Sequence, residues 1–149
     1  MADIKVVIGD PKAKQSVQKE LKDDAAKPLL GLRLGDKISG ELLDLPGYEF
    51  EITGGSDFAG FPMRRDVPGI TRKRILAVSG VGINNKKKYR KKKQKGLRTM
   101  KGMRQRKSMA GNTVYEKTAQ VNMKVIKHGP TPLPFVVKAA APEGEKKAE

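Results

Sequence analysis

Residues 48–57 read YEFEITGGSD and carry the clearest β-strand pattern in this chain of 149 residues. Tyr48, Phe50 and Ile52 alternate with polar residues, a period of two that turns one face of a strand to the core and the other to water. The Gly-Gly-Ser-Asp that follows predicts a turn, because glycine readily adopts a positive φ and Asp57 can hydrogen-bond its own backbone. This segment therefore predicts a half-buried strand that ends near residue 53.

Apolar residues also alternate toward both ends of the chain, at 4–8 and at 121–125. Further strands are expected at 30–34, 38–43 and 72–78. Turn residues separate these segments at intervals of about 8–12 residues, which is typical of small β-barrels and sandwiches. We therefore expect an all-β fold, a small antiparallel β-barrel. Residues 12–22 fit either a short helix or a second hairpin strand.

Charge is concentrated in one part of the chain. Residues 1–57 hold 8 Lys or Arg and 11 Asp or Glu, residues 58–115 hold 18 and 1, and residues 116–149 hold 6 and 4. The formal net charge of +16 therefore comes from the middle interval. A basic block of this kind predicts a polyanionic partner.

The most basic stretch is residues 86–107, KKKYRKKKQKGLRTMKGMRQRK, with 13 basic residues and no acid. Its few apolar side chains bury too little surface to offset the entropy of ordering the chain. We therefore predict a long basic arm over 79–112 that interrupts a core of 1–128, is disordered alone and orders on a nucleic acid. Scattered glycines and mixed Lys and Arg favour folded RNA over DNA. Residues 129–149 are expected to form a Pro/Ala/Glu/Lys tail.

The composition excludes several kinds of chemistry. The chain has no Cys and a single His, His128, so we expect no disulfide, no metal site and no cofactor. Residues 80–84 lack the remaining positions of a phosphate-binding loop, and no serine has a histidine nearby that would activate it. We expect neither an enzyme nor a small-molecule substrate, and a soluble protein without a membrane segment. His128 is expected to face solvent.

Residues 52–63 read ITGGSDFAGFPM. This stretch, called the signature segment below, closely resembles the signature of the archaeal and eukaryotic small-subunit ribosomal protein S6e family, a Gly-Gly-x-Asp turn followed by a Gly-x-Pro-Met loop. Other landmarks of the family resemble residues 5–11, 28–38 and 111–125, so that the resemblance spans residues 3–126. The matching positions of the signature are Gly54, Gly55, Asp57, Gly60, Pro62 and Met63.

The resemblance implies a β-barrel lodged on small-subunit ribosomal RNA, beside neighbouring ribosomal proteins, in cytoplasmic ribosomes. It also makes residues 16–21 a strand. No counterpart is expected of the long basic C-terminal helix that eukaryotic members of the family carry. The alternative function is that of a non-ribosomal accessory protein that binds DNA or RNA.

The candidate RNA contacts are the cations that follow the signature segment, since Arg and Lys form charge-assisted hydrogen bonds with phosphate. Tyr89 is added as a base-stacking candidate and Asn112 as a hydrogen-bonding one. Two interpretations of Gly54-Gly55 stay open, which are close approach of the backbone to a phosphate and a turn that only shapes the barrel. The candidates are Arg64, Arg65, Arg72, Lys73, Arg74, Lys86, Lys87, Lys88, Tyr89, Arg90, Lys91, Lys92, Lys93, Lys95, Arg98, Lys101, Arg104, Arg106, Lys107 and Asn112.

Overall fold

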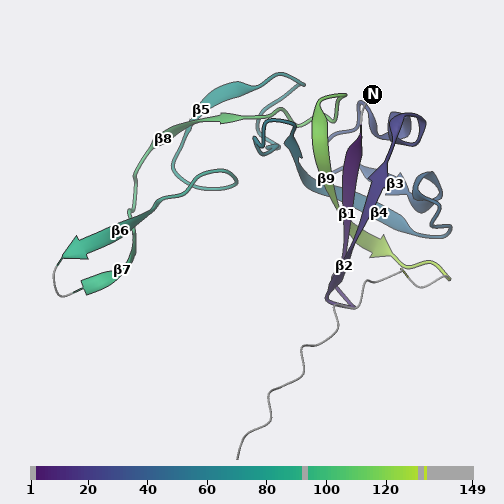
Figure 1. Cartoon of the computed structure of the whole chain (residues 1–149), viewed down its shortest axis with the longest axis horizontal. Helices are drawn as coiled ribbons and strands as arrows, with labels where there is room; N and C mark the ends of the chain where they lie inside the picture. Colours follow the sequence, from purple (N-terminus) through teal and green to yellow (C-terminus); the bar gives the residue numbers. More distant parts are fainter. Residues whose placement is uncertain (1–2, 92–93, 131–132, 134–149) are drawn as a thin grey trace, which may run out of the picture.

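The three alternating segments form neighbouring strands of one sheet (Figure 1). The computed structural model describes residues 3–91, 94–130 and 133. The expected all-β fold is confirmed, because the helices among the described residues are two short 3-10 segments, η1 (Asp23–Leu29) and η2 (Gly40–Leu43). The sheet has five strands in the order β2-β1-β9-β4-β3, with bounds β1 Ile4–Asp10, β2 Gln15–Leu21, β3 Lys37–Ser39, β4 Glu49–Asp57 and β9 Thr118–Lys127.

The first and last strands of the sheet pair parallel, so the sheet is not purely antiparallel as predicted. β1 lies parallel to β9, with Val6 opposite Val121, whereas β2, β3 and β4 pair antiparallel with their neighbours. The ambiguous segment 12–22 is resolved as a strand, since β2 forms a hairpin with β1 and places Leu21 opposite Ile4. The implied strand at 16–21 is thus confirmed.

One face of the sheet is buried, as the alternation predicts. Phe50 and Ile52 of β4 are fully buried beside Val121 of β9, and η1 and η2 add Leu29 and Leu43 to the same cluster. Burial of such side chains contributes about 1.5–3 kcal/mol each relative to exposure. This cluster, and not the strand pairing alone, makes the sheet the stable part of the molecule.

The predicted barrel is wrong, because the sheet is open. β2 and β3 are its edges, and no strand pairing among the described residues joins them. Residues 30–34, an expected strand, instead form a loop in which Gly31 has φ 86°, and residues 40–43 form η2, which ends at Asp44 with φ 59°. The chain that would have closed a barrel therefore covers the buried face as loops and 3-10 turns.

The signature glycines lie within a strand, which corrects the predicted turn. β4 continues through Gly54 and Gly55 to Asp57, with irregular register against β9 between Ile52 and Gly54. A Cβ at Gly55 would lie 2.5 Å from the carbonyl oxygen of Gln120 and 2.8 Å from the sulfur of Met63. Gly55 is therefore required by close packing inside the protein.

Beyond β4 the chain leaves the sheet as a long two-stranded ribbon (Figure 1). β5 (Lys73–Ala77) pairs with β8 (Gln105–Met109), and farther out β6 (Lys86–Lys91) pairs with β7 (Gln94–Thr99). We call residues 73–109 the ribbon arm, its β5–β8 part the proximal ribbon and its β6–β7 part the distal ribbon. The expected strand at 72–78 is confirmed as β5.

The described part of this segment is paired as strands, and the predicted disorder of the free arm stays a prediction. Cross-strand hydrogen bonds satisfy the backbone N–H and C=O groups of a ribbon without an apolar core, and the side-chain composition alone does not reveal this possibility. Lys92 and Lys93 lie outside the described residues. Of the predicted tail at 129–149, the structure describes only Gly129, Pro130 and Leu133.

Candidate nucleic-acid interface

The proximal ribbon spaces its cations so that they do not face each other. Arg74 lies opposite Ser108, Leu76 opposite Arg106, and Ile75 opposite Lys107. Like charges directly opposite in a sheet are destabilising, so this register avoids that cost. The proximal ribbon can therefore carry its charge without a ligand.

The distal ribbon differs at two of its six cross-strand pairs. Its register places Lys87 opposite Arg98 and Arg90 opposite Lys95. Like charges directly opposite each other destabilise a sheet, and a polyanion would relieve such repulsion. The side chains of residues 87–98 lie outside the described part of the structure.

Seven cations of the ribbon arm are exposed, and none forms an ion pair with a described residue. They come from both ribbons and from the connection between β7 and β8. An exposed, uncompensated row of cations attracts a linear polyanion. These residues are Lys73, Arg74, Lys86, Lys101, Arg104, Arg106 and Lys107.

The three candidate arginines nearest the sheet already have carboxylate partners. Arg65 lies 3.1 Å from Glu51 and keeps 62% of its side chain exposed. Arg64 is only 14% exposed, and it donates two hydrogen bonds to Asp66, at 2.8 and 2.6 Å, and a third to the carbonyl of Val81 at 3.3 Å. The hydrogen bonds from Arg64 lower the pKa of Asp66, so this pair stays charged near neutral pH.

Arg72 pairs with a buried carboxylate. Asp57 is 1% exposed and accepts hydrogen bonds from Arg72 and from the hydroxyl of Tyr115, the latter at 3.1 Å. Burial raises the pKa of Asp57, but the hydrogen bonds from Arg72 and Tyr115 and the charge of Arg72 outweigh it, so the pKa lies below its usual value. The guanidinium of Arg72 also stacks over the ring of Phe61, 5.1 Å from its centroid.

Asp57 is thus an ion-pair residue, and it also begins a turn as predicted, because its carbonyl accepts a hydrogen bond from the amide of Gly60 at 2.8 Å. Sequence reasoning missed Tyr115, which lies 58 residues away along the chain. Burial, and then the hydrogen bond to the charged Asp57, raise the pKa of the Tyr115 hydroxyl, which keeps it a hydrogen-bond donor at neutral pH.

Asn112 faces the protein backbone. Its side-chain oxygen accepts hydrogen bonds from the amide of Gly69 at 3.2 Å and from the hydroxyl of Thr113 at 3.0 Å. Its backbone amide donates to the carbonyl of Val67 at 2.8 Å. Asn112 therefore fixes the loop at 67–69 against the chain that returns from the ribbon arm.

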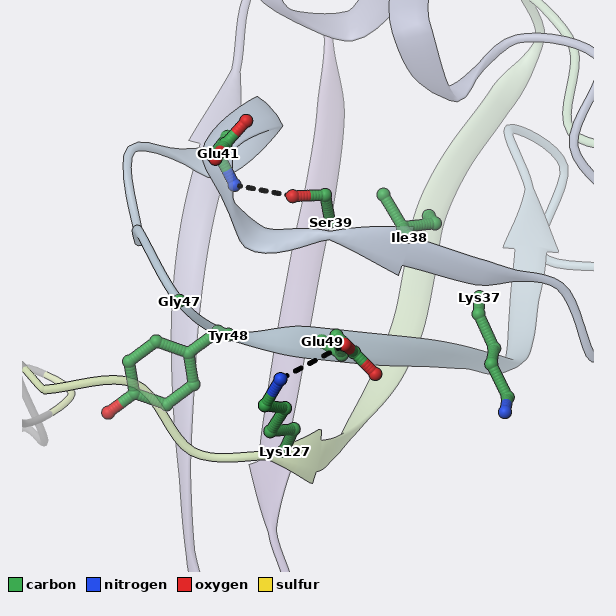
Figure 2. Close-up of a pocket in the computed structure, with 8 residues that line it drawn as sticks. All are labelled: Lys37, Ile38, Ser39, Glu41, Gly47, Tyr48, Glu49 and Lys127. Carbon is green, nitrogen blue, oxygen red and sulfur yellow. Dashed lines mark hydrogen bonds and ion pairs between the residues drawn. The ribbon is translucent and has the colours of Figure 1, made fainter.

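A pocket of about 320 Å³ opens where β3, β4 and the end of β9 meet (Figure 2). Two lysines line this pocket. Lys127 lies 3.6 Å from Glu49, whereas Lys37 is exposed and has no ion pair with a described residue. The Ser39 hydroxyl accepts a hydrogen bond from the Glu41 amide at 3.5 Å. The charge of Lys127 is thus compensated internally, unlike those of the ribbon arm. Nearby, His128 does not simply face solvent, because it lies 3.6 Å from Asp10 and against the edge of the Tyr48 ring.

Other kinds of site are not found in the part of the chain that the structure describes. No group of three or more His, Cys, Asp or Glu lies close enough to hold a metal ion. No helix there is long and apolar enough to cross a membrane. The ribbon arm is therefore the strongest candidate for an interface.

Comparison with known proteins gives concordant results. The family model of ribosomal protein S6e matches residues 4–138. Small ribosomal subunit protein eS6 of Archaeoglobus fulgidus is 42% identical over 137 residues, which cover 91% of this chain and 96% of the relative. The eS6 protein of Nitrosopumilus maritimus is 41% identical over 150 aligned residues, covering 100% of this chain and 97% of the relative. That of Methanococcus maripaludis strain C6 is 41% identical over 129 residues, with 87% and 91% covered.

Proposed function

The chain belongs to the ribosomal protein S6e family, and on this premise we propose that its ribbon arm binds the RNA of the small ribosomal subunit. The protein is a structural component of that subunit and not an enzyme. Its partners are ribosomal RNA and neighbouring ribosomal proteins, and it resides on cytoplasmic ribosomes.

The observation that carries this proposal is the row of seven exposed arm cations without an acidic partner among the described residues. Binding of such cations to phosphates releases counterions, and this release dominates the affinity of proteins for nucleic acids. The ribbon offers cations on both of its faces, since Arg74 and Lys73 are neighbours in one strand. This suits contact with phosphates of several RNA segments better than reading of bases in one groove.

The candidate contacts differ in side-chain exposure and in whether their donors already have partners within the protein. We assign most of the phosphate contacts to the seven exposed arm cations and to the cations among residues 87–98, which include Lys92 and Lys93. Arg65 and Arg72 keep 62% and 40% of their side chains exposed and add a smaller share. Arg64, whose donors are taken by Asp66 and Val81, contributes least. Asn112 contributes through the loop that it holds.

Replacement of five arm cations by glutamine tests the proposal. A variant with Lys73, Arg74, Arg104, Arg106 and Lys107 all replaced should bind small-subunit ribosomal RNA more weakly than the native protein does. The slope of log K against log salt should become shallower by roughly 0.7–0.9 for each phosphate that the arm no longer neutralises. In sucrose gradients the variant should leave the small subunit at lower salt than the native protein.

A matched control removes the same charge from the sheet and its loops. Lys5, Lys12, Lys22, Lys27 and Lys37 are all exposed, and their replacement by glutamine should leave the salt slope nearly unchanged. Equal weakening in the two variants would mean that net charge alone matters and would refute an arm-specific interface. Native protein that is absent from the small-subunit peak would support the non-ribosomal alternative.

A further inference from the structure

We propose that residues 57–66 form a socket that fixes the direction of the ribbon arm, and that buried Asp57 is its main positioning residue. This inference rests on the proposed function, because it concerns how the arm is presented to RNA. It assigns a role to residues 57–63 of the signature segment that is separate from the two interpretations of Gly54-Gly55. In this role the segment binds the arm of its own chain, and the arm binds the RNA.

Asp57 joins the sheet to both ends of the arm. Arg72, which pairs with its carboxylate, directly precedes β5, where the chain enters the arm. Tyr115, which donates to the same carboxylate oxygen, follows β8, where the chain has returned. A buried carboxylate is costly to desolvate, so Asp57 depends on the hydrogen bonds from these two partners. The same contacts hold Arg72 and Tyr115 in one geometry. The stacking of Arg72 on Phe61 restricts the entry further.

The returning chain is held by the backbone of the same segment. The amide of Ala110 donates to the carbonyl of Pro62 at 3.0 Å, and Met63 forms a parallel bridge with Ala110. Ala110 comes directly after the last residue of β8. The Pro62-Met63 part of the signature segment thus continues the proximal ribbon toward the sheet.

The loop between β5 and β6 provides a third attachment. Arg64 donates to the carbonyl of Val81 while it also holds Asp66 through two further hydrogen bonds. A Cβ at Gly82 would lie 2.8 Å from Pro62 and 2.6 Å from Met109, so the loop backbone lies directly against the socket. Attachment of the entry, the exit and a loop leaves the base of the arm little freedom to swing.

The socket predicts an effect of charge opposite in sign to simple electrostatics. Asp57→Asn makes the protein more basic by one charge, so net charge alone would predict tighter RNA binding. Loss of the ion pair instead frees the arm to adopt other directions. If the oriented state falls to about a tenth of the population, the apparent Kd for small-subunit ribosomal RNA rises about tenfold.

The matched control is Asp44→Asn. Asp44 is an exposed carboxylate paired with Lys19, and its φ of 59° is one that asparagine accepts. The two variants have the same change in charge and differ in whether the carboxylate belongs to the socket. Asp44→Asn should bind RNA at least as tightly as the native chain. Equal weakening in both variants would overturn the proposal.

The direction of the arm is measured without RNA by spin labels. The chain has no Cys, so Ser16→Cys on β2 and Leu76→Cys on β5 place single labels on the exposed sheet edge and the proximal ribbon. The distance distribution should be narrow in the native and Asp44→Asn backgrounds and broad in Asp57→Asn. Tyr115→Phe, which removes one hydroxyl and no charge, should broaden it less. It also serves as the test should Asp57→Asn fail to fold.

An unchanged distribution in a folded Asp57→Asn or Tyr115→Phe protein would overturn the socket, whatever the RNA result. Broadening without loss of RNA affinity would overturn the positioning role. By contrast, a native protein that does not bind small-subunit ribosomal RNA would refute the proposed function but leave the distance measurements unaffected. Failure of the socket and failure of the proposed function are therefore distinguishable.

Discussion

The sheet and the ribbon arm use the same basic residues in different ways. On the sheet and its edges, several cations have acids beside them, such as Lys5 with Glu20 at 3.2 Å and Lys124 with Glu51 at 2.8 Å, although Lys12, Lys22 and Lys37 have no ion pair with a described residue. In the arm, the exposed cations have no described acidic partner. The sheet is also built on a buried apolar cluster, whereas the arm relies on backbone pairing. The sheet is therefore stable alone, whereas the arm has no apolar cluster of its own and its dense positive charge favours a polyanionic partner.

Amide hydrogen exchange of the free protein should show the largest contrast between the two regions. Amides of β1, β4 and β9 should open only with global unfolding, which costs about 5–15 kcal/mol in typical domains. Amides of β6 and β7 should exchange close to the rate of an unfolded chain, because an isolated two-stranded hairpin is marginally stable and this one pairs like charges. RNA should slow the exchange of β6 and β7. Equal protection of both regions in the free protein would contradict the comparison.

Truncation of apolar side chains should also distinguish the sheet from the arm, with a smaller difference than the one expected in hydrogen exchange. Phe50→Ala should lower the free energy of unfolding by about 3–5 kcal/mol, since Phe50 is fully buried in the sheet. Leu76→Ala should change it by about 0.5 kcal/mol or less, since Leu76 is 54% exposed on the arm. Urea denaturation followed by circular dichroism measures both. A large decrease for Leu76→Ala would mean that the arm is part of the core.

Features that depend on neighbouring residues could be predicted from the sequence, whereas features that depend on contacts between distant residues could not. The strands around Ile4, Phe50 and Met123 were predictable because alternation is a local pattern between residues i and i+2. The open sheet was not, because it depends on Gly31 and Asp44 turning the covering segments into loops. The partners of Asp57 come from 15 and 58 positions away, beyond any local signal. The socket could therefore be found only in three dimensions.

Alanine at the two signature glycines tests why glycine is present in the strand that leads to the socket. Gly55→Ala should lower the free energy of unfolding by about 1–3 kcal/mol, because its Cβ would overlap the Gln120 carbonyl. Gly54→Ala is the matched control, with its nearest neighbour at 4.0 Å, and should cost less. Thermal and urea unfolding measure the difference. If Gly54→Ala instead weakens RNA binding and leaves stability unchanged, close approach of a phosphate would be the better explanation.

The smallest effect expected is the acid sensitivity of the base of the arm. The pKa of Asp57 is lower in the folded protein than in the unfolded chain, where it is about 3.9. The carboxylate therefore stabilises the fold above about pH 3.9, and this contribution is lost as the pH falls through the folded pKa. Asp57→Asn lacks the titrating group, so the difference in unfolding free energy between the native chain and this variant should be constant near neutral pH and shrink in acid. Urea denaturation from neutral pH downward measures it. A difference that stays constant into strong acid would show that the Asp57 carboxylate is not what joins the arm to the sheet, because the ion pair with Arg72 exists only while that carboxylate is charged.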